Sequence, residues 1–100
     1  MSLRVEFLSG ADSDLQDVFN RFEDYREGFG VEFMAVVDAY LVRIAAFPKI
    51  APVYIANVRR QVIRRFPYGI FYEPHPTRVL IVAILDLRQD EERILQRLQR

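Results

Sequence analysis

Residues 59–72 read RRQVIRRFPYGIFY, and this stretch is the most informative part of the sequence for both fold and function. Four arginines fall within its first seven residues, and a Phe-Pro-Tyr step then leads into an apolar and aromatic run. Strands are predicted over residues 58–66 and 68–73, with Pro67 at the start of the second. Arginine carries a fixed charge and a planar fork of donors that suits phosphates and carboxylates. A packed core does not need four arginines together, so the stretch predicts a surface that meets an anionic partner.

The chain before this stretch is predicted to form a short strand and two helices. Apolar and charged residues alternate over residues 3–7, which is typical of a half-buried strand. A helix follows, capped by Ser9, Asp12 or Ser13, with its apolar residues on one face. A second amphipathic helix runs from about residue 31 to residue 46 and is stopped by a proline. The short turn between them, which contains glycine, predicts an antiparallel helical hairpin that lies on a sheet.

The remaining segments predict a loop, one more strand and a short helix. Residues 48–57 and 73–77 each contain two prolines, which cannot sit within a ladder, and are predicted as a loop and a turn. Residues 79–85 are apolar at every position, which is typical of a central strand buried on both faces. Asp90 caps the closing helix. The order predicts an α+β fold with a largely antiparallel sheet, one face under the hairpin and the other open.

Length and composition predict a single domain over residues 1–100. Hydrophobic residues make up 51% of the chain, which is enough for one core. The net charge is zero, but residues 1–50 carry −4 and residues 51–100 carry +4, so the second half is expected to face phosphate or an acidic protein. The lack of cysteine excludes disulfides. With no secretory leader and no apolar run of ~20 residues, we expect a cytoplasmic protein without a membrane partner.

The string RRFPYGIFY, followed by an apolar strand that ends in LDLRQD, resembles the RelE/ParE superfamily of toxins from bacterial toxin–antitoxin modules. The similarity covers nearly the whole chain and includes the opening strand, the break at residues 9–10 and the acidic first helix. It implies the same α+β fold, in the order β-α-α-β-β-β-(α). It also implies a protein partner, since members pair with a small antitoxin whose extended or helical segment wraps the toxin.

Members of this superfamily act in two ways. ParE-like members inhibit DNA gyrase, whereas RelE-like members cleave messenger RNA on the ribosome. RelE-type enzymes place an arginine in the third strand, another just after the last strand, and a tyrosine or histidine near the C-terminus. When Tyr72 is lined up with their strand tyrosine, these positions fall on Gly69, Arg88 and about Ile94, and a histidine of many relatives falls on Asp86. Most groups expected for RNA cleavage are thus missing.

These absences favour a ParE-like toxin of the plasmid-stabilisation type, which inhibits its target by binding and is neutralised by a cognate antitoxin. An enzyme is the less favoured class. One alternative is a ribosome-dependent, metal-independent mRNA endoribonuclease that uses Arg64 or Arg65, Arg88 and a tyrosine. Another is an inactive relative that only binds its antitoxin. No cofactor is expected, and both a homodimer and a heterotetramer with the antitoxin stay open.

The candidate binding residues share the quoted stretch or follow the last strand: Arg59, Arg60, Arg64, Arg65, Tyr68, Tyr72 and Arg88. The candidates for catalysis among them are Arg64, Arg65, Tyr68 and Arg88. On a continuous strand, residues 60 and 64 point one way and residues 59 and 65 the other, so the four arginines cannot serve one site. Alternatively, the arginines are solvated or paired, some with the acidic first helix. The tyrosines then pack with a polar tip.

Three further features have open roles. Arg88 either reaches a phosphate or pairs with a neighbouring aspartate. His75, the only histidine, lies in a predicted turn, and without cysteine or a second histidine we expect no metal site. The apolar side of the closing helix either covers the open face of the sheet or belongs to a surface for the antitoxin or a second copy.

Overall fold

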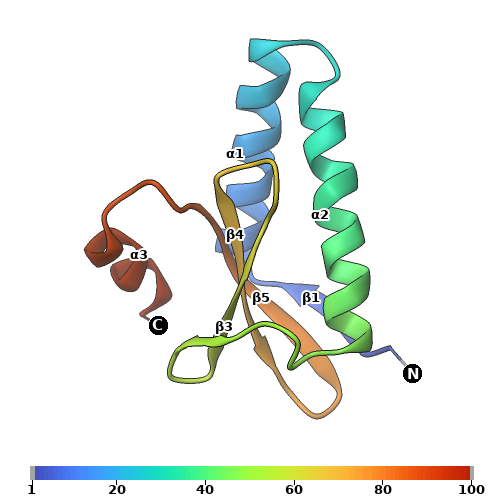
Figure 1. Ribbon diagram of the computed structural model, residues 1–100, viewed down its shortest axis with the longest axis vertical. Coiled ribbons are helices and arrows are strands. Elements are labelled where there is room, and N and C mark those ends of the chain that lie inside the picture. The colour runs from blue at the N-terminus through green and yellow to red at the C-terminus, as the bar shows by residue number, and fades with distance from the viewer. Residues whose placement is uncertain (1, 100) are drawn as a thin grey trace.

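Eight elements follow one another in the computed structural model, which describes residues 2–99 (Figure 1). They are β1 (Arg4–Phe7), α1 (Ser9–Tyr25), α2 (Phe29–Ala46), β2 (Val53–Ile55), β3 (Val58–Val62), β4 (Tyr68–Pro74), β5 (Arg78–Asp86) and α3 (Glu91–Leu98). The order matches the predicted one, with one strand added. Within residues 2–99, no helix is both long and apolar enough to cross a bilayer.

The strands form one five-stranded sheet in the order β1-β5-β4-β3-β2. Strand β1 runs parallel to β5, and the other neighbours are antiparallel. Arg59 lies opposite Tyr72, and Tyr68 lies opposite Asp86. Residues directly opposite one another share a face of the sheet. The predicted α+β fold with a largely antiparallel sheet is therefore confirmed.

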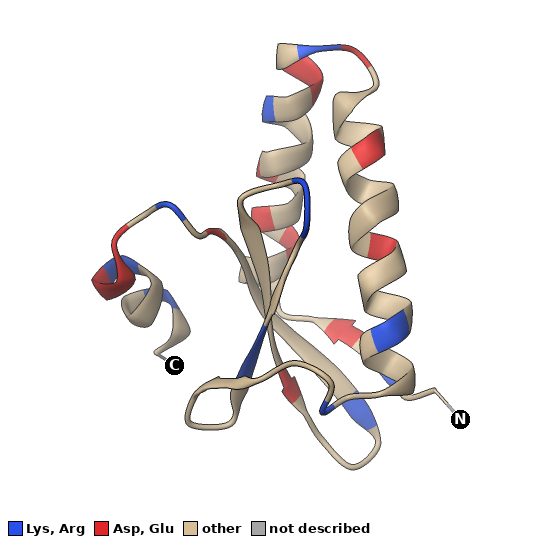
Figure 2. Ribbon diagram, viewed as in Figure 1, with Lys and Arg blue, Asp and Glu red and all other residues tan. Residues whose placement is uncertain are grey.

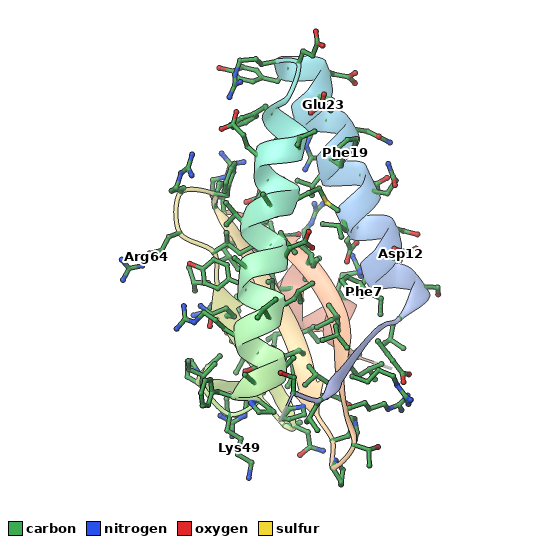
Figure 3. The ribbon with its side chains drawn as sticks, turned by 90° about the vertical axis from the view of Figure 1, so that its right-hand side faces the viewer. Phe7, Asp12, Phe19, Glu23, Lys49 and Arg64 are labelled. Carbon is green, nitrogen blue, oxygen red and sulfur yellow. The ribbon has the colours of Figure 1, made fainter. Side chains whose placement is uncertain are left out.

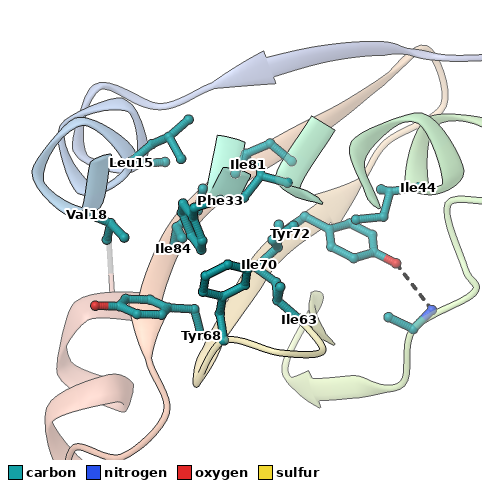
Figure 4. Packing of buried hydrophobic residues seen from close by; sticks show 14 of the residues in the cluster. Leu15, Val18, Phe33, Ile44, Ile63, Tyr68, Ile70, Tyr72, Ile81 and Ile84 are labelled. Atoms are coloured by element: carbon teal, nitrogen blue, oxygen red, sulfur yellow. Dashed lines mark hydrogen bonds between the residues drawn. The ribbon is translucent and has the colours of Figure 1, made fainter. Parts of the chain in front are cut away.

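The helical hairpin covers one face of the sheet, where most of the core lies (Figure 4). Ile70 and Tyr72 of β4 and Ile81 of β5 pack there against Phe33 and Ile44 of α2, and all five are fully buried. The amphipathic hairpin was predicted from the apolar stripes of both helices. Burial of this apolar surface is the main stabilising contribution to such a fold.

The opposite face is not open, contrary to the prediction. Ile94 and Leu98 of α3 are buried against Phe71, Val82 and Leu85 of the sheet. The closing helix thus takes the first of its two proposed roles. A strand such as β5 is apolar at successive positions because both of its faces are covered.

Three predicted boundaries are wrong. Strand β2 lies inside the predicted loop, where Val53-Tyr54-Ile55 pairs with β3 through a two-residue turn. Strand β3 ends at Val62 instead of residue 66, because the chain turns over residues 63–67 before β4. Helix α1 begins at Ser9 after Leu8, and no side chain caps it. Asp90 does occupy the N-cap position of α3, but its side chain forms no capping hydrogen bond, contrary to the prediction.

The turn between the helices is held by a side chain that the sequence pattern did not indicate. The Glu23 carboxylate accepts hydrogen bonds from the backbone N–H groups of Gly28 (3.0 Å) and Val31 (3.1 Å) at the start of α2. These bonds lower the pKa of Glu23, and the bond from Gly28 makes the largest contribution. Gly28 has a left-handed backbone (φ 87°), which suits glycine. The capped turn explains why α2 begins at Phe29, two residues before the predicted start.

Candidate functional site

Four cationic residues lie on the side of the molecule where α2 faces β3, and we call this group the cationic side: Lys49, Arg59, Arg64 and Arg65. Lys49 follows α2, Arg59 belongs to β3, and the last two lie in the turn between β3 and β4. Figure 3 shows Lys49 and Arg64 projecting from the same side of α2, with Asp12 and Glu23 on the other. Figure 2 shows the matching pattern, with acidic residues along α1 and basic residues at the β3–β4 turn.

Arg64 and Arg65 are placed by the β3–β4 turn. The backbone N–H of Arg64 donates to the hydroxyl of Tyr40 on α2 (3.2 Å), which fixes the turn beside that helix. Within residues 2–99, no carboxylate lies within ion-pairing distance of the Arg64 guanidinium. The Arg65 side chain is 66% exposed, and its Nη2 lies 3.9 Å from Glu32, which already holds Arg26 at 2.9 Å. Both guanidinium groups therefore keep donors for a partner.

The first two arginines of the quoted stretch point to opposite faces. Arg59 shares the helix face with Tyr72, and its Nη1 donates to the carbonyl oxygens of Lys49 (3.2 Å) and Ala51 (2.7 Å). Arg60 lies on the α3 face, with its guanidinium 4.9 Å from the ring centroid of Tyr54. The arginines thus do not serve one site, as predicted, but the predicted division is wrong. Because β3 ends at Val62, strand alternation does not extend to residues 64 and 65.

Tyr68 and Tyr72 belong to the core. Tyr72 is fully buried, its hydroxyl accepts the Ala51 N–H (3.4 Å, Figure 4), and burial raises its pKa. Tyr68 is 2% exposed, and its hydroxyl accepts a hydrogen bond from Arg21 of α1. The structure therefore brings neither tyrosine onto the cationic side. The alternative reading, in which each ring packs and only its hydroxyl finds a polar partner, describes both.

Arg88 is engaged by the neighbouring aspartate. Its Nε (3.1 Å), Nη2 (2.8 Å) and backbone N–H (2.8 Å) all donate to the Asp86 carboxylate. The side-chain bonds from Arg88 are the main cause of the lowered pKa of Asp86. The pair offsets the charge of Arg88, although the side chain is 72% exposed. Of its two predicted roles, the structure shows the pairing.

The position that the resemblance gives to a catalytic arginine is closed. A side chain at Gly69 would place its Cβ 3.0 Å from Leu87, with Arg60 and Phe71 each at 3.4 Å. Ile94, at about the position of the C-terminal aromatic residue, is buried under the sheet. His75 contacts Glu73, with 3.1 Å between its Nε2 and the carboxylate Oε1. Gly69, Ile94 and His75 therefore do not bring an acid, a base and a cation together.

The acidic first helix is met by an arginine that the sequence did not single out. Nη1 and Nη2 of Arg97 in α3 donate to the Asp14 carboxylate at 2.9 Å and 2.8 Å. Within residues 2–99, none of the arginines at 59, 60, 64 and 65 forms an ion pair with α1. The proposed pairing of these arginines with the first helix is therefore wrong for the described residues. Their charge stays available on the surface.

Exposed apolar side chains accompany the cationic side. Phe47 is 65% exposed, and Ile50 and Val53 follow it along the chain with large exposed fractions. A cavity of about 600 Å³ opens beside Phe47 and Lys49, against the β4–β5 turn at Pro74. Sequence reasoning missed Lys49, since tertiary bonds of its loop, among them the two from Arg59, bring it next to β3. Cations beside exposed apolar side chains suit an acidic polypeptide with apolar anchors.

Comparison with known proteins places the fold. No family model matches the chain, and no curated protein matches it. Among solved structures, it is similar to one described as the chromosomal ParDE TA system from P. aeruginosa, with a TM-score of 0.76 and 11% identity. The match covers 87% of this chain and 98% of that chain. The chain therefore has the fold found in the ParDE system, and the fold expected from the RelE/ParE resemblance is confirmed.

Proposed function

We propose that this chain is the toxin of a type II toxin–antitoxin pair, acts in the cytoplasm by binding a protein target, and is neutralised by an antitoxin on the cationic side. The observation that carries the proposal is the state of Arg64 and Arg65. Both project from a turn anchored to α2, and among residues 2–99 neither guanidinium has a close carboxylate of its own. Such groups favour an acidic partner segment, whose apolar residues would contact Phe47 and Ile50.

The backbone of Arg65 adds support. Its φ of 77° lies in the left-handed region, which costs a residue with a side chain roughly 1–2 kcal/mol. Glycine would meet no such cost. An arginine held there at the expense of stability suggests that its charge is needed at the surface.

The positions that the resemblance assigns to RNA cleavage favour inhibition by binding instead. Leu87 fills the space in front of Gly69, Asp86 holds Arg88, and Ile94 is buried. A metal-independent ribonuclease needs groups that move a proton and stabilise the phosphorane-like transition state. Of the residues named for that role, only Arg64 and Arg65 stand exposed without a strong partner. DNA gyrase, the target of ParE-like toxins, is therefore the first target to test.

Induced expression in a bacterial host tests the mode of action. We expect growth arrest with a DNA-damage response and intact messenger RNA, and inhibition of supercoiling by purified gyrase. Mapping of RNA 5′ ends after induction measures cleavage directly. Site-specific cuts that disappear in Arg88→Ala or Arg65→Ala would replace the proposal with an endoribonuclease. Normal growth with tight antitoxin binding would identify an inactive relative.

A binding assay tests the proposed surface. The partner is the small acidic protein encoded beside this chain, if the adjoining reading frame supplies one. We expect Arg64→Glu to weaken its binding at least about 10-fold, because a close charge pair contributes ~1.5 kcal/mol or more. Arg93→Glu is the matched control, since Arg93 is an exposed arginine on α3, away from the cationic side. Equal loss in both variants, or in neither, would refute the surface.

A further inference from the structure

Helix α2 is apolar on the side that faces solvent as well as on the side that faces the core. We call this the outer face of α2: Val31, Ala35, Ala39 and Val42. Val31 is 59% and Val42 is 68% exposed, and the two alanines between them are exposed. In Figure 3, α2 is the element nearest the viewer, and no other segment crosses it. A helix that is apolar around most of its circumference is normally buried on all sides, so this face lacks a partner.

Two opposite charges flank the outer face. Glu32 lies near the start of α2 and Arg43 near its end. Their separation of 11 residues is close to three helical turns, so they lie along one edge, roughly 16 Å apart. The Glu32 side chain is 44% exposed, although Arg26 contacts it, and Arg43 is also exposed. A partner helix that runs antiparallel meets these charges in the reverse order.

The chemistry of the face is symmetric about one point. The midpoints of Val31 and Val42, of Glu32 and Arg43, and of Ala35 and Ala39 all fall within one residue of Val37. A two-fold axis there brings each valine near its counterpart, each glutamate near an arginine, and the small alanines to the closest approach. Such reciprocity is what an interface between identical surfaces requires, because residue i contacts j and residue j contacts i.

From this symmetry, we propose that a second copy of the chain binds here, with the two α2 helices packed antiparallel. The two-fold axis crosses the outer face at the level of Val37, whose own side chain is buried in the core. A heterologous partner has no need of this symmetry. The acidic antitoxin proposed above is also disfavoured on the outer face, since both Glu32 and Asp38 would repel it. Its expected surface, the cationic side, lies around the β3 edge of α2. The inference therefore does not depend on the proposed toxin activity.

One residue opposes the association. Asp38 is exposed and lies close to the axis, on the edge away from Glu32 and Arg43. The two copies of Asp38 would face each other, and like charges repel, although water and salt screen exposed groups. One helix from each copy also offers less than the ~800 Å² per partner of a standard interface. We therefore expect a weak, micromolar dimer that tightens when Asp38 is neutralised.

Sedimentation equilibrium on the full chain, prepared by cell-free synthesis, tests the dimer. We expect a mass that doubles with concentration in the micromolar range. Arg43→Glu should weaken the dimer at least 10-fold, because Glu32 would then meet a glutamate. The double exchange Glu32→Arg with Arg43→Glu should restore it to within about 3-fold. Asp38→Asn should tighten it about 3-fold or more, and Arg93→Glu on α3 should leave it unchanged.

Each other outcome contradicts the inference. A chain that stays monomeric at several hundred micromolar has no such interface. A dimer that ignores Arg43→Glu, or that the double exchange fails to restore, uses another surface, as does one that Asp38→Asn weakens. Circular dichroism checks that each variant is folded. If the exchange variants do not fold, Asp38→Asn still tests the inference, because it changes one exposed side chain with little change in shape.

Discussion

Two turns beside α2 solve the same backbone problem with different residues. The turn between α1 and α2 uses Gly28 at a positive φ of 87°, and the turn between β3 and β4 uses Arg65 at 77°. In the first turn, the nearby charge of Glu23 is engaged by backbone N–H groups. In the second, the guanidinium points to solvent with one distant carboxylate. The first turn places a glycine where the backbone needs one, whereas the second places an exposed arginine in a conformation that costs stability.

The largest effect is expected where the first turn meets α1. Gly30→Ala adds a Cβ that would lie 2.6 Å from the carbonyl oxygen of Phe19 and 2.9 Å from the Glu23 side chain. Alanine gains up to ~1 kcal/mol in helix propensity, but a clash with backbone costs roughly 1–3 kcal/mol and cannot be relieved by a rotamer change. We expect a net loss of about 2 kcal/mol in the free energy of unfolding, measured in urea.

The control for this variant is Gly10→Ala in α1, where the nearest atom to the new Cβ is Nη2 of Arg97 at 3.6 Å. That distance is an ordinary contact, so this variant should keep or slightly increase stability. Equal stability of the two variants would show that the hairpin turn yields easily.

Gly28→Ala measures what the left-handed backbone of the same turn costs a residue that has a side chain. No atom lies within 4 Å of the added Cβ, so the only cost is the left-handed conformation. We expect a loss of about 1 kcal/mol, again from urea unfolding. A loss as large as that of Gly30→Ala would mean that conformation, and not close approach, limits both positions.

Arg65→Gly converts the second turn into the first type. Relief of the positive φ should gain about 1 kcal/mol, and the greater freedom of glycine in the unfolded chain should remove about half of that. We expect a small net gain of about 0.5 kcal/mol together with weaker antitoxin binding. Arg64→Gly is the control, since Arg64 has no positive φ and should lose stability. A loss of stability in Arg65→Gly would remove the argument that this arginine is held against its preference.

The smallest expected effect is on how stability changes at acid pH. The pKa of Glu23 is lowered in the folded chain, so its stabilising contribution is complete above the ordinary value of 4.5 and is lost as the pH falls below it. Glu23→Gln should therefore flatten the decline of stability between about pH 5 and pH 3, because the amide does not titrate there. Thermal unfolding across this range measures it. An unchanged slope would show that the carboxylate contributes little to the turn.

The regular elements were predictable because apolar spacing fixes them. The stripe of α2 and the unbroken apolar run of β5 have few other interpretations. Strand β2 escaped prediction because three residues directly after Pro52 give too short a pattern. The end of β3 escaped prediction because Arg65, and not glycine or asparagine, occupies the left-handed position of the turn, so Pro67 is the one turn residue in that segment.

The sequence predicted the kind of partner for the candidate site, but not where in the fold the site residues lie. The arginine cluster indicated an anionic partner, and Arg64 and Arg65 are still predicted to bind it. Which face Tyr68 and Tyr72 occupy depends on where the helical hairpin docks, and strand alternation cannot specify that. Lys49 joins the cationic side only through contacts formed after folding.

The parallel pairing of β1 with β5 has a consequence for protein synthesis. Arg4 lies opposite Arg78, so the first strand made can pair only after the last strand, β5, has been made. Contacts so far apart in sequence form late, because the intervening chain must first be ordered. A chain whose synthesis stops before β5 emerges would therefore lack the strand that pairs with both β1 and β4. A cell that makes the full chain would be exposed to its folded form only after translation has passed that point.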